Sequence, residues 1–212
     1  GLLGGPGNIC AAELLVDGSE ITRRGRSVMT KTTAENRLPG DLTREELIER
    51  MIRVDHAGEF GAQRIYEGQL AVLGDTVDGE TIRHMKEQED RHLAAFERLI
   101  VERRVRPTAL HPLWNIAGFA LGAGTALLGP KVAMACTIAV EEVIVEHYAR
   151  QSEQLGDDEA DLRETIEAFR AEELEHRDIA VDHGGEEAIG YPVLRRLIQA
   201  GSRTAIWLSE RV

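Results

Sequence analysis

The sequence predicts an all-α protein, a bundle of four long helices with a crossover helix and a C-terminal helix. Three observations favour this fold. Apolar residues recur at about 3.6-residue spacing over long segments. Prolines, glycines and capping residues divide the chain into helix-length pieces, and no segment alternates like a strand beside a hairpin turn. A chain of 212 residues forms about one domain and can bury a core without disulfides.

A capping box marks the start of the first helix. Thr43 and Glu46 have the required spacing, and an apolar stripe continues from them to Gly74, which predicts a helix of about thirty residues. The second helix is expected from near Asp78 to Arg104, because a proline follows shortly afterwards and prevents its continuation.

Prolines and glycines delimit the last three helices. Pro130 is expected to begin the fourth helix, because proline is tolerated in the first turn, and Gly156 to end it. The fifth helix is expected to begin near Asp157 or Asp158 and to end by Gly184 and Gly185, and the sixth is expected to follow Pro192 to about Ser209.

The segment from Pro107 to Pro130 contains no Asp, Glu, Lys or Arg, although 29% of the chain is charged. It is expected to form the third helix, and its prolines and glycines argue against a simple membrane-spanning helix. Gly118, Gly122 and Ala126 have a spacing that lets two helices approach closely. Two interpretations follow, which do not exclude each other: a crossover helix buried against the bundle, and a segment that contacts a membrane surface.

Residues 1–40 are expected to be a disordered arm, and residues 41–212 to form the folded domain. The arm contains Gly, Ser, Thr and scattered charges, and it lacks the apolar core and cleavage site of a signal peptide. Met29 is an alternative start of the chain. Cys10 and Cys136 have no second Cys or His at ligand spacing, so no disulfide framework is predicted and a reducing compartment is expected.

Acidic residues outnumber basic ones: 37 Asp and Glu against 25 Lys and Arg leave a formal net charge of -12. Most of such a surface repels a phosphate backbone, so nucleic acid is not an expected partner. The glycine pattern that begins at Gly122 and Gly124 lacks its third glycine and a preceding strand, so no Rossmann site is predicted. Any reductant must therefore come from another molecule.

Two Glu-x-x-His motifs indicate chemistry. Glu89 and His92 are expected on the second helix, and Glu173 and His176 on the fifth. Residues three apart project about 60° from each other on one face of a helix, so each pair can bind one ion. Alone the motif is weak evidence, because nearly one occurrence is expected by chance in a chain so rich in Glu.

An internal repeat adds two further acidic residues. Glu59 on the first helix is followed by a tyrosine after seven residues and a glutamine after ten, and Glu141 on the fourth helix is followed by the same residue types at the same spacings. The chain therefore looks like a duplicated helix pair. The predicted metal ligands are Glu59, Glu89, His92, Glu141, Glu173 and His176.

Four carboxylates and two imidazoles are the ligand set of a two-metal site at the centre of a four-helix bundle. Two divalent ions would balance the four carboxylate charges, whereas four buried Glu without metal would carry a large desolvation cost. Carboxylates and imidazoles without thiolate suit iron or manganese, and iron is the metal that activates dioxygen. The sequence therefore predicts a non-haem di-iron centre.

Other polar residues near the motifs are expected outside the ligand set. His56 has no counterpart in the second repeat, which favours a capping or supporting role. Glu172 and Glu175 are expected to face solvent. Tyr148 is expected to point inward, as a core aromatic or as a hydrogen-bond donor behind the ligands, and His147 lies off the ligand face as a structural or supporting residue.

The chain contains further distinctive segments, some of them without predicted ligands. They are Arg53–Glu59 (RVDHAGE), Arg104–Thr108 (RVRPT), Pro112–Asn115 (PLWN), Gly118–Gly129 (GFALGAGTALLG), Met134–Cys136 (MAC), Ala139–Glu142 (AVEE) and Glu172–His176 (EELEH). In these segments the chain resembles the demethoxyubiquinone hydroxylase family of ubiquinone biosynthesis. The resemblance covers residues 43–212.

The resemblance implies a ferritin-like fold in which the six predicted ligands bind two irons. It also implies hydroxylation of the ring of a polyprenylated demethoxyubiquinone or demethoxyubiquinol with O2, the penultimate step towards ubiquinone. The two electrons would come from an external reductant such as NADH, directly or through a reductase, or from the quinone itself. The implied partners are the polyprenyl quinone, a membrane surface and a lipid-binding accessory protein. The implied location is peripheral on the inner membrane, facing the bacterial cytoplasm or the mitochondrial matrix.

The residues alone leave other functions open. A ferritin-like iron-storage or ferroxidase protein would share the six ligands, although it does not need an uncharged segment. A rubrerythrin-like peroxidase would carry a four-cysteine iron domain, which two isolated cysteines cannot form. A structural bundle without metal is the third alternative.

Overall fold

The computed structural model describes residue 38 and residues 40–212 and confirms an all-α fold in that part of the chain. Nearly all of the predicted arm, including Cys10 and Met29, lies outside the described residues. The expectation that the arm is disordered therefore stays a prediction.

The chain divides into two units, residues 1–41 and residues 42–212. Among the described residues of the first unit, the Asp41 N–H donates to the Leu38 carbonyl oxygen (3.1 Å). The helices of the second unit are α1 (Arg44–Leu73), α2 (Val77–Glu102), α3 (His111–Leu127), α4 (Pro130–Gln154), α5 (Ala160–Asp182) and α6 (Tyr191–Ser209), with 3₁₀ turns at Asp157–Glu159 and Gly185–Glu187.

The helix boundaries follow the predictions closely. The capping box of α1 is present: the Glu46 N–H donates to the Thr43 hydroxyl (3.0 Å), and the Thr43 N–H donates to the Glu46 carboxylate (2.7 Å). The fifth helix differs, because the residues expected to form its first turn adopt a 3₁₀ turn. α5 therefore begins at Ala160 rather than at Asp157.

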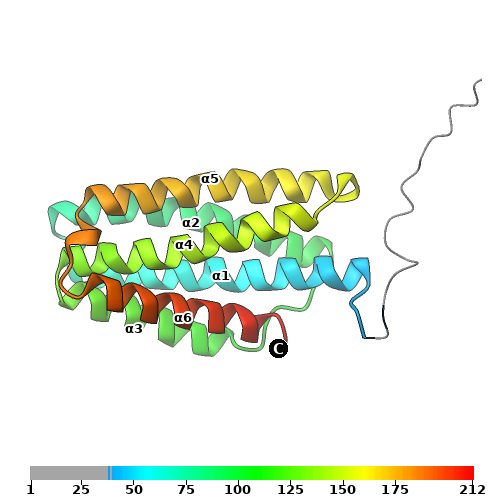
Figure 1. The fold of residues 1–212 in the computed structure, drawn as a ribbon, viewed down its shortest axis with the longest axis horizontal. Coiled ribbons are helices and arrows are strands. Elements are labelled where there is room, and N and C mark those ends of the chain that lie inside the picture. Colours follow the sequence, from blue (N-terminus) through cyan, green and yellow to red (C-terminus); the bar gives the residue numbers. More distant parts are fainter. Residues whose placement is uncertain (1–37, 39) are drawn as a thin grey trace, which may run out of the picture. The chain divides into compact units, whose positions relative to one another are not determined.

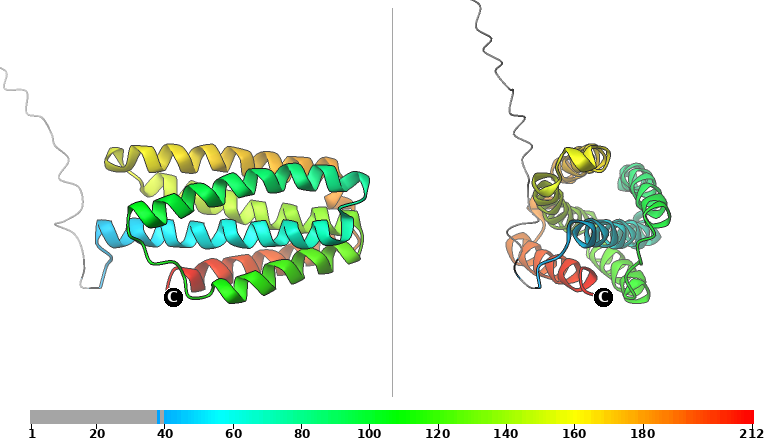
Figure 2. Two further views of the ribbon diagram at one scale, coloured as in Figure 1. Left: turned by 180° about the vertical axis from the view of Figure 1, so that it is seen from behind. Right: turned by 90° about the vertical axis from the view of Figure 1, so that its right-hand side faces the viewer.

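Helices α1, α2, α4 and α5 form the bundle, and α3 and α6 cover one side of it (Figure 1). Helices α1 and α4 lie in the middle. Helices α2 and α5 complete the bundle on one side of them, and α3 and α6 lie on the other side, as the end-on view in Figure 2 also shows. The pairs α1–α2 and α4–α5 are antiparallel neighbours. Helix α3 is the crossover that leads from the first pair to the second.

Apolar clusters fill both ends of the bundle. One cluster contains Ile52, Phe96 and Ile166, and the other contains Ile82 and Met134, all of them fully buried. On each long helix the predicted metal ligands stand between these two sets of apolar positions. The bundle therefore places its acidic residues at mid-height, between two apolar ends that exclude water.

Helix α3 packs on α1 through a face of glycines. A Cβ added at Gly118 would lie 2.9 Å from the Gly61 carbonyl oxygen. A Cβ added at Gly122 would overlap the Ile65 carbonyl oxygen, so the predicted close approach is confirmed. This contact agrees with the prediction of a crossover or packing helix. The opposite face is not covered, because Ile116 is 69% exposed, so α3 is buried on one face only.

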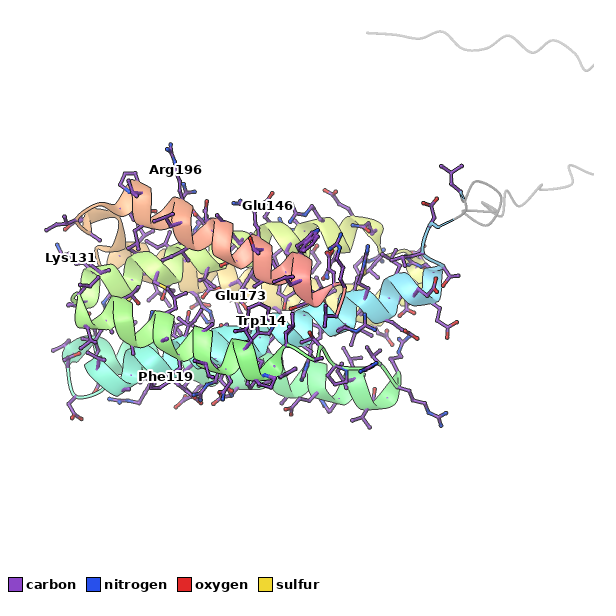
Figure 3. The ribbon with its side chains drawn as sticks, turned by 90° about the horizontal axis from the view of Figure 1, so that it is seen from below. Trp114, Phe119, Lys131, Glu146, Glu173 and Arg196 are labelled. Atoms are coloured by element: carbon purple, nitrogen blue, oxygen red, sulfur yellow. The ribbon has the colours of Figure 1, made fainter. Side chains whose placement is uncertain are left out.

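Helices α3 and α6 together present an apolar surface. Figure 3 looks onto this layer, with Phe119 on α3 and Arg196 on α6. The exposed large apolar side chains of the two helices are Leu113, Ile116, Phe119, Leu127, Val193, Leu197 and Trp207. Within residues 42–212, none of the helices combines the length and the apolar composition needed to cross a membrane.

Replacing Gly122 with alanine is expected to destabilise the protein by roughly 1–3 kcal/mol, because the added methyl group overlaps the Ile65 backbone and forces α3 away from α1. Gly124→Ala is the matched control. Nothing lies within 4 Å of a Cβ at that position, and the change is expected to stabilise the helix by up to about 1 kcal/mol. Denaturant unfolding measures both effects, and equal stabilities of the two variants would contradict the close packing.

Candidate metal centre

The six predicted ligand side chains meet at the centre of the bundle, and none of them is more than 1% exposed. All four bundle helices contribute: α1 provides Glu59, α2 provides Glu89 and His92, α4 provides Glu141, and α5 provides Glu173 and His176. Glutamate is almost never fully buried unless it is paired. Four such carboxylates in one place therefore require compensating positive charge or protons.

The ligand atoms form two overlapping groups. They are the Glu59–His92 site, which also includes Glu89 and Glu173, and the Glu141–His176 site, which includes the same two carboxylates. Within each group the ligand atoms lie within 4.8 Å of one another. This arrangement would allow Glu89 and Glu173 to be shared by two neighbouring ions.

Several polar atoms of this cluster make no hydrogen bond of suitable geometry, although some of them lie close to another ligand atom. They are Glu59 Oε2, both carboxylate oxygens of Glu89, His92 Nδ1, Glu141 Oε2 and Glu173 Oε1. An unpartnered buried polar atom costs roughly 1–3 kcal/mol, and more when it is charged. Each of these atoms is of the type that coordinates a divalent cation, so the residues present fit a pair of metal ions.

Burial shifts the pKa values of the cluster. It raises the pKa of Glu89 well above its ordinary range, with a further rise from the charge of Glu173, and it likewise raises the pKa of Glu141. Burial opposes protonation of His92, but contacts with the neighbouring carboxylates, Glu173 foremost, outweigh it and raise the pKa to about 11. The cluster therefore holds protons when it holds no cation.

Both histidines point Nδ1 at the carboxylates. His92 Nδ1 lies 3.0 Å from Glu173 Oε1 and 3.5 Å from Glu59 Oε2. His176 Nδ1 lies 3.1 Å from Glu89 Oε1 and 3.1 Å from Glu173 Oε2. In both rings Nδ1 is therefore the nitrogen that faces a cation, and Nε2 is free for another partner.

The Nε2 atoms contact residues of the opposite helix pair. His92 Nε2 lies 3.2 Å from Glu172 Oε2, and His176 Nε2 lies 2.9 Å from Gln88 Oε1. The expectation that Glu172 faces solvent is wrong, because α5 lies close enough to α2 for this carboxylate to reach the His92 ring. Gln88 was missed, although the repeat held a signal: like Glu172, it directly precedes the glutamate of a Glu-x-x-His motif.

The tyrosine of each repeat hydrogen-bonds to the glutamate of the other repeat. The Tyr66 hydroxyl donates to Glu141 Oε1 (2.8 Å), and the Tyr148 hydroxyl donates to Glu59 Oε1. Both tyrosines are thus inward-facing donors behind predicted ligands as well as members of the apolar clusters. A catalytic role for Tyr148 stays a prediction.

His147 lies beside the cluster rather than in it. Its Nε2 lies 3.2 Å from Asp55 Oδ1, and the Gln151 amide donates to the same oxygen (2.7 Å). Asp55 is buried, which raises its pKa, and its second oxygen has no partner. Asp55 was missed from the sequence, although it stands one helical turn before Glu59. A catalytic role for His147 also stays a prediction.

His56 is in neither ligand group. Its Nδ1 lies 3.2 Å from Nε2 of His111, so the two rings join α1 to the start of α3. Burial lowers the pKa of His56 to about 4, which keeps the ring neutral at physiological pH. This contact agrees with the expectation of a supporting role.

An apolar cavity of about 350 Å³ adjoins the Glu59 side of the cluster. Helices α1, α3, α4 and α6 line it, and Tyr148 lies in its wall with Glu59. Trp114 extends from α3 to α6 across the cavity wall, where its indole N–H donates to the Ser209 hydroxyl (3.0 Å; Figure 3). A cavity of this size with few polar groups is typical of a site for a small organic ligand.

The fold and the cluster define a class of protein: ferritin-like helical bundles with a carboxylate–histidine site at their centre. Within that class, the chain matches the family described as "Ubiquinone biosynthesis protein COQ7" over residues 46–209, and it belongs to that family. The resemblance to demethoxyubiquinone hydroxylases is thereby confirmed.

Named relatives support the same assignment. The "3-demethoxyubiquinol 3-hydroxylase" of Rhodospirillum rubrum is 58% identical over 183 residues, which are 86% of each chain. The "NADPH-dependent 3-demethoxyubiquinone 3-hydroxylase, mitochondrial" of Dictyostelium discoideum is 50% identical over 200 residues, 88% of this chain and 92% of the relative. The "5-demethoxyubiquinone hydroxylase, mitochondrial" of Saccharomyces cerevisiae is 42% identical over 182 residues, 78% of each chain.

Metal binding to this cluster is expected to release protons and to strengthen as the pH rises. His92, whose pKa is raised to about 11, is protonated at neutral pH in the metal-free protein and must lose that proton before it can bind a cation. The raised pKa of Glu89 acts in the same direction, because its carboxyl group must also be ionised to bind a cation. Calorimetric titration with Mn²⁺ in buffers of different ionisation enthalpy counts the released protons. Glu175→Gln, at an exposed position of α5, is the control and should not change the count. An affinity that does not change with pH would contradict the protonated cluster.

Proposed function

We propose that this protein hydroxylates the ring of a polyprenylated demethoxyubiquinone or demethoxyubiquinol, the penultimate step towards ubiquinone, at a di-iron centre. Membership of the family and the names of the relatives support the hydroxylation. The observation that carries the metal part of the proposal is the pair of overlapping ligand groups that share Glu89 and Glu173.

Each iron would be held by one glutamate of its own, one histidine Nδ1 and the two shared carboxylates. Two divalent ions would balance the four carboxylates, and they would satisfy the oxygen and nitrogen atoms that have no other partner. When bound, the iron pair would supply the activation of dioxygen. Tyr66 and Tyr148 would hold the unshared carboxylates, Glu141 and Glu59, in position by hydrogen bonds.

The cavity beside Glu59 is the proposed site of the quinone ring. Its lining is largely apolar, which excludes water and favours a ring substituted with methyl and methoxy groups. The isoprenoid tail would leave between α3 and α6, whose outward side chains are apolar. An iron-storage protein does not need such a cavity next to its metal ligands, so this feature favours the hydroxylase over that alternative.

The reaction also needs electrons and protons from outside the site. The ring C–H becomes C–OH, and the second oxygen atom of O2 leaves as water after the uptake of two electrons and two protons. The proposed donor is a nicotinamide cofactor, acting directly or through a reductase. NADH was expected, and the name of the Dictyostelium relative adds NADPH as a candidate.

We further propose that the protein is peripheral on the inner membrane, on the cytoplasmic side in a bacterium or on the matrix side in a mitochondrion. The apolar side chains on α3 and α6 support this location. Since a net charge of -12 does not attract the protein to anionic lipid, apolar insertion is expected to dominate. A lipid-binding accessory protein that presents the quinone is a further proposed partner.

Glu141→Ala and Glu173→Ala are expected to lose bound iron and to abolish hydroxylation, because each removes a carboxylate from one or both sites. Glu175→Ala is the matched control at an exposed position of α5 and should retain both properties. Metal analysis of purified protein measures iron. Quinone extraction from a strain that lacks its own hydroxylase, and therefore accumulates the demethoxyquinone, measures activity. Full activity of either buried variant would contradict the proposed centre.

Ile116→Gln and Leu197→Gln are each expected to weaken binding to lipid vesicles roughly ten- to hundredfold, because inserting one such side chain into an apolar phase contributes roughly 1.5–3 kcal/mol. Val77→Gln is the matched control: Val77 is 90% exposed but stands at the start of α2, outside the α3–α6 layer. Vesicle flotation measures the bound fraction. Equal losses in all three variants would contradict a specific membrane-facing surface.

A further inference from the structure

The two helix pairs make equivalent contacts with different residues. Gln88 and Glu172 each directly precede a motif glutamate, and each contacts Nε2 of the histidine on the other pair. In the same way, the tyrosine of each pair donates a hydrogen bond to a glutamate of the other pair. One structurally equivalent position behind the ligands therefore carries a neutral amide in the first pair and a carboxylate in the second.

This difference acts on the histidines directly. A metal ion on Nδ1 uses the lone pair of that nitrogen, so the neutral ring carries its proton on Nε2 and donates it to whatever acceptor lies there. A hydrogen bond to a carboxylate is roughly twice as strong as one to a neutral carbonyl. It also makes the imidazole a more basic ligand, which strengthens the bond to the metal.

Other contacts fix His92 more firmly than its counterpart. Glu172 Oε2 also accepts a hydrogen bond from Arg91 (3.0 Å), which holds the carboxylate against the ring. The His92 ring stacks on Phe169 with a centroid separation of 4.0 Å. The ring contacts of His176 are longer: its centroid lies 6.1 Å from that of Tyr66, in an edge arrangement, and 6.4 Å from that of His92.

We propose that Glu172 and Gln88 are positioning residues that make the two metal sites unequal, so that the Glu59–His92 site binds its ion more tightly and fills first. Because Glu59 lines the apolar cavity, the firmly held ion is the one beside the bound ring. This inference rests on the di-iron centre proposed above.

Anaerobic titration with ⁵⁷Fe(II), followed by Mössbauer spectroscopy, tests this inference without any measurement of turnover. At one equivalent of iron, the wild-type protein is expected to show mainly one of the two signals seen at two equivalents. Glu59→Ala identifies that signal, because it removes a ligand from only one site. The preference is the ratio of iron in the Glu59–His92 site to iron in the Glu141–His176 site at one equivalent, and Glu172→Gln is expected to reduce it by roughly tenfold. The double variant Glu172→Gln with Gln88→Glu, which exchanges the two acceptors, is expected to reverse it.

Glu175→Gln is the control, since it removes the same charge from an exposed position of α5 without touching either histidine. Its preference should equal that of the wild type. Equal filling in the wild-type protein, an unchanged preference in Glu172→Gln, or no reversal in the double variant would overturn the inference while leaving the di-iron centre intact. A wild-type protein that binds no iron would overturn both.

Discussion

The structure depends on a single electrostatic constraint: four carboxylates are buried together at the centre of the bundle. Carboxylates cannot remain ionised side by side in an apolar interior unless positive charge lies among them. The raised pKa values of Glu89, Glu141 and His92 are the response of the protein alone, which binds protons there. The unpartnered oxygens and the inward-facing Nδ1 of His92 suit the alternative response, a pair of cations.

The duplicated helix pair explains how the chain builds such a centre. Neither pair is complete by itself, because the tyrosine, the glutamine and the residue before each motif all contact groups on the other pair. Glu89 and Glu173 are shared by both ligand groups. Folding of the centre therefore requires docking of the two pairs, and the apolar clusters at either end drive that docking by removing apolar surface from water.

Helices α3 and α6 break the symmetry of the bundle and connect the centre to its surroundings. The glycine face of α3 lets it lie against α1 at backbone contact distance, which turns its apolar side chains outward. The cavity lies beneath these two helices and reaches Glu59 but not Glu141. One half of the duplicated centre thus faces the proposed quinone site, and the other half does not.

The sequence by itself determined the helices and the ligand candidates, because caps, prolines and the Glu-x-x-His spacing act within one or two turns of a helix. The internal repeat added Glu59 and Glu141 to the ligand candidates, since the same spacing to a tyrosine and a glutamine places both residues at equivalent positions on their helices. Only the tertiary structure decided the partners of the histidines: Glu172 and Gln88 reach rings 80 and 88 residues away along the chain. It also decided the cavity and the exposed face of α3, since what covers a helix depends on neighbours from distant parts of the chain and not on the helix itself.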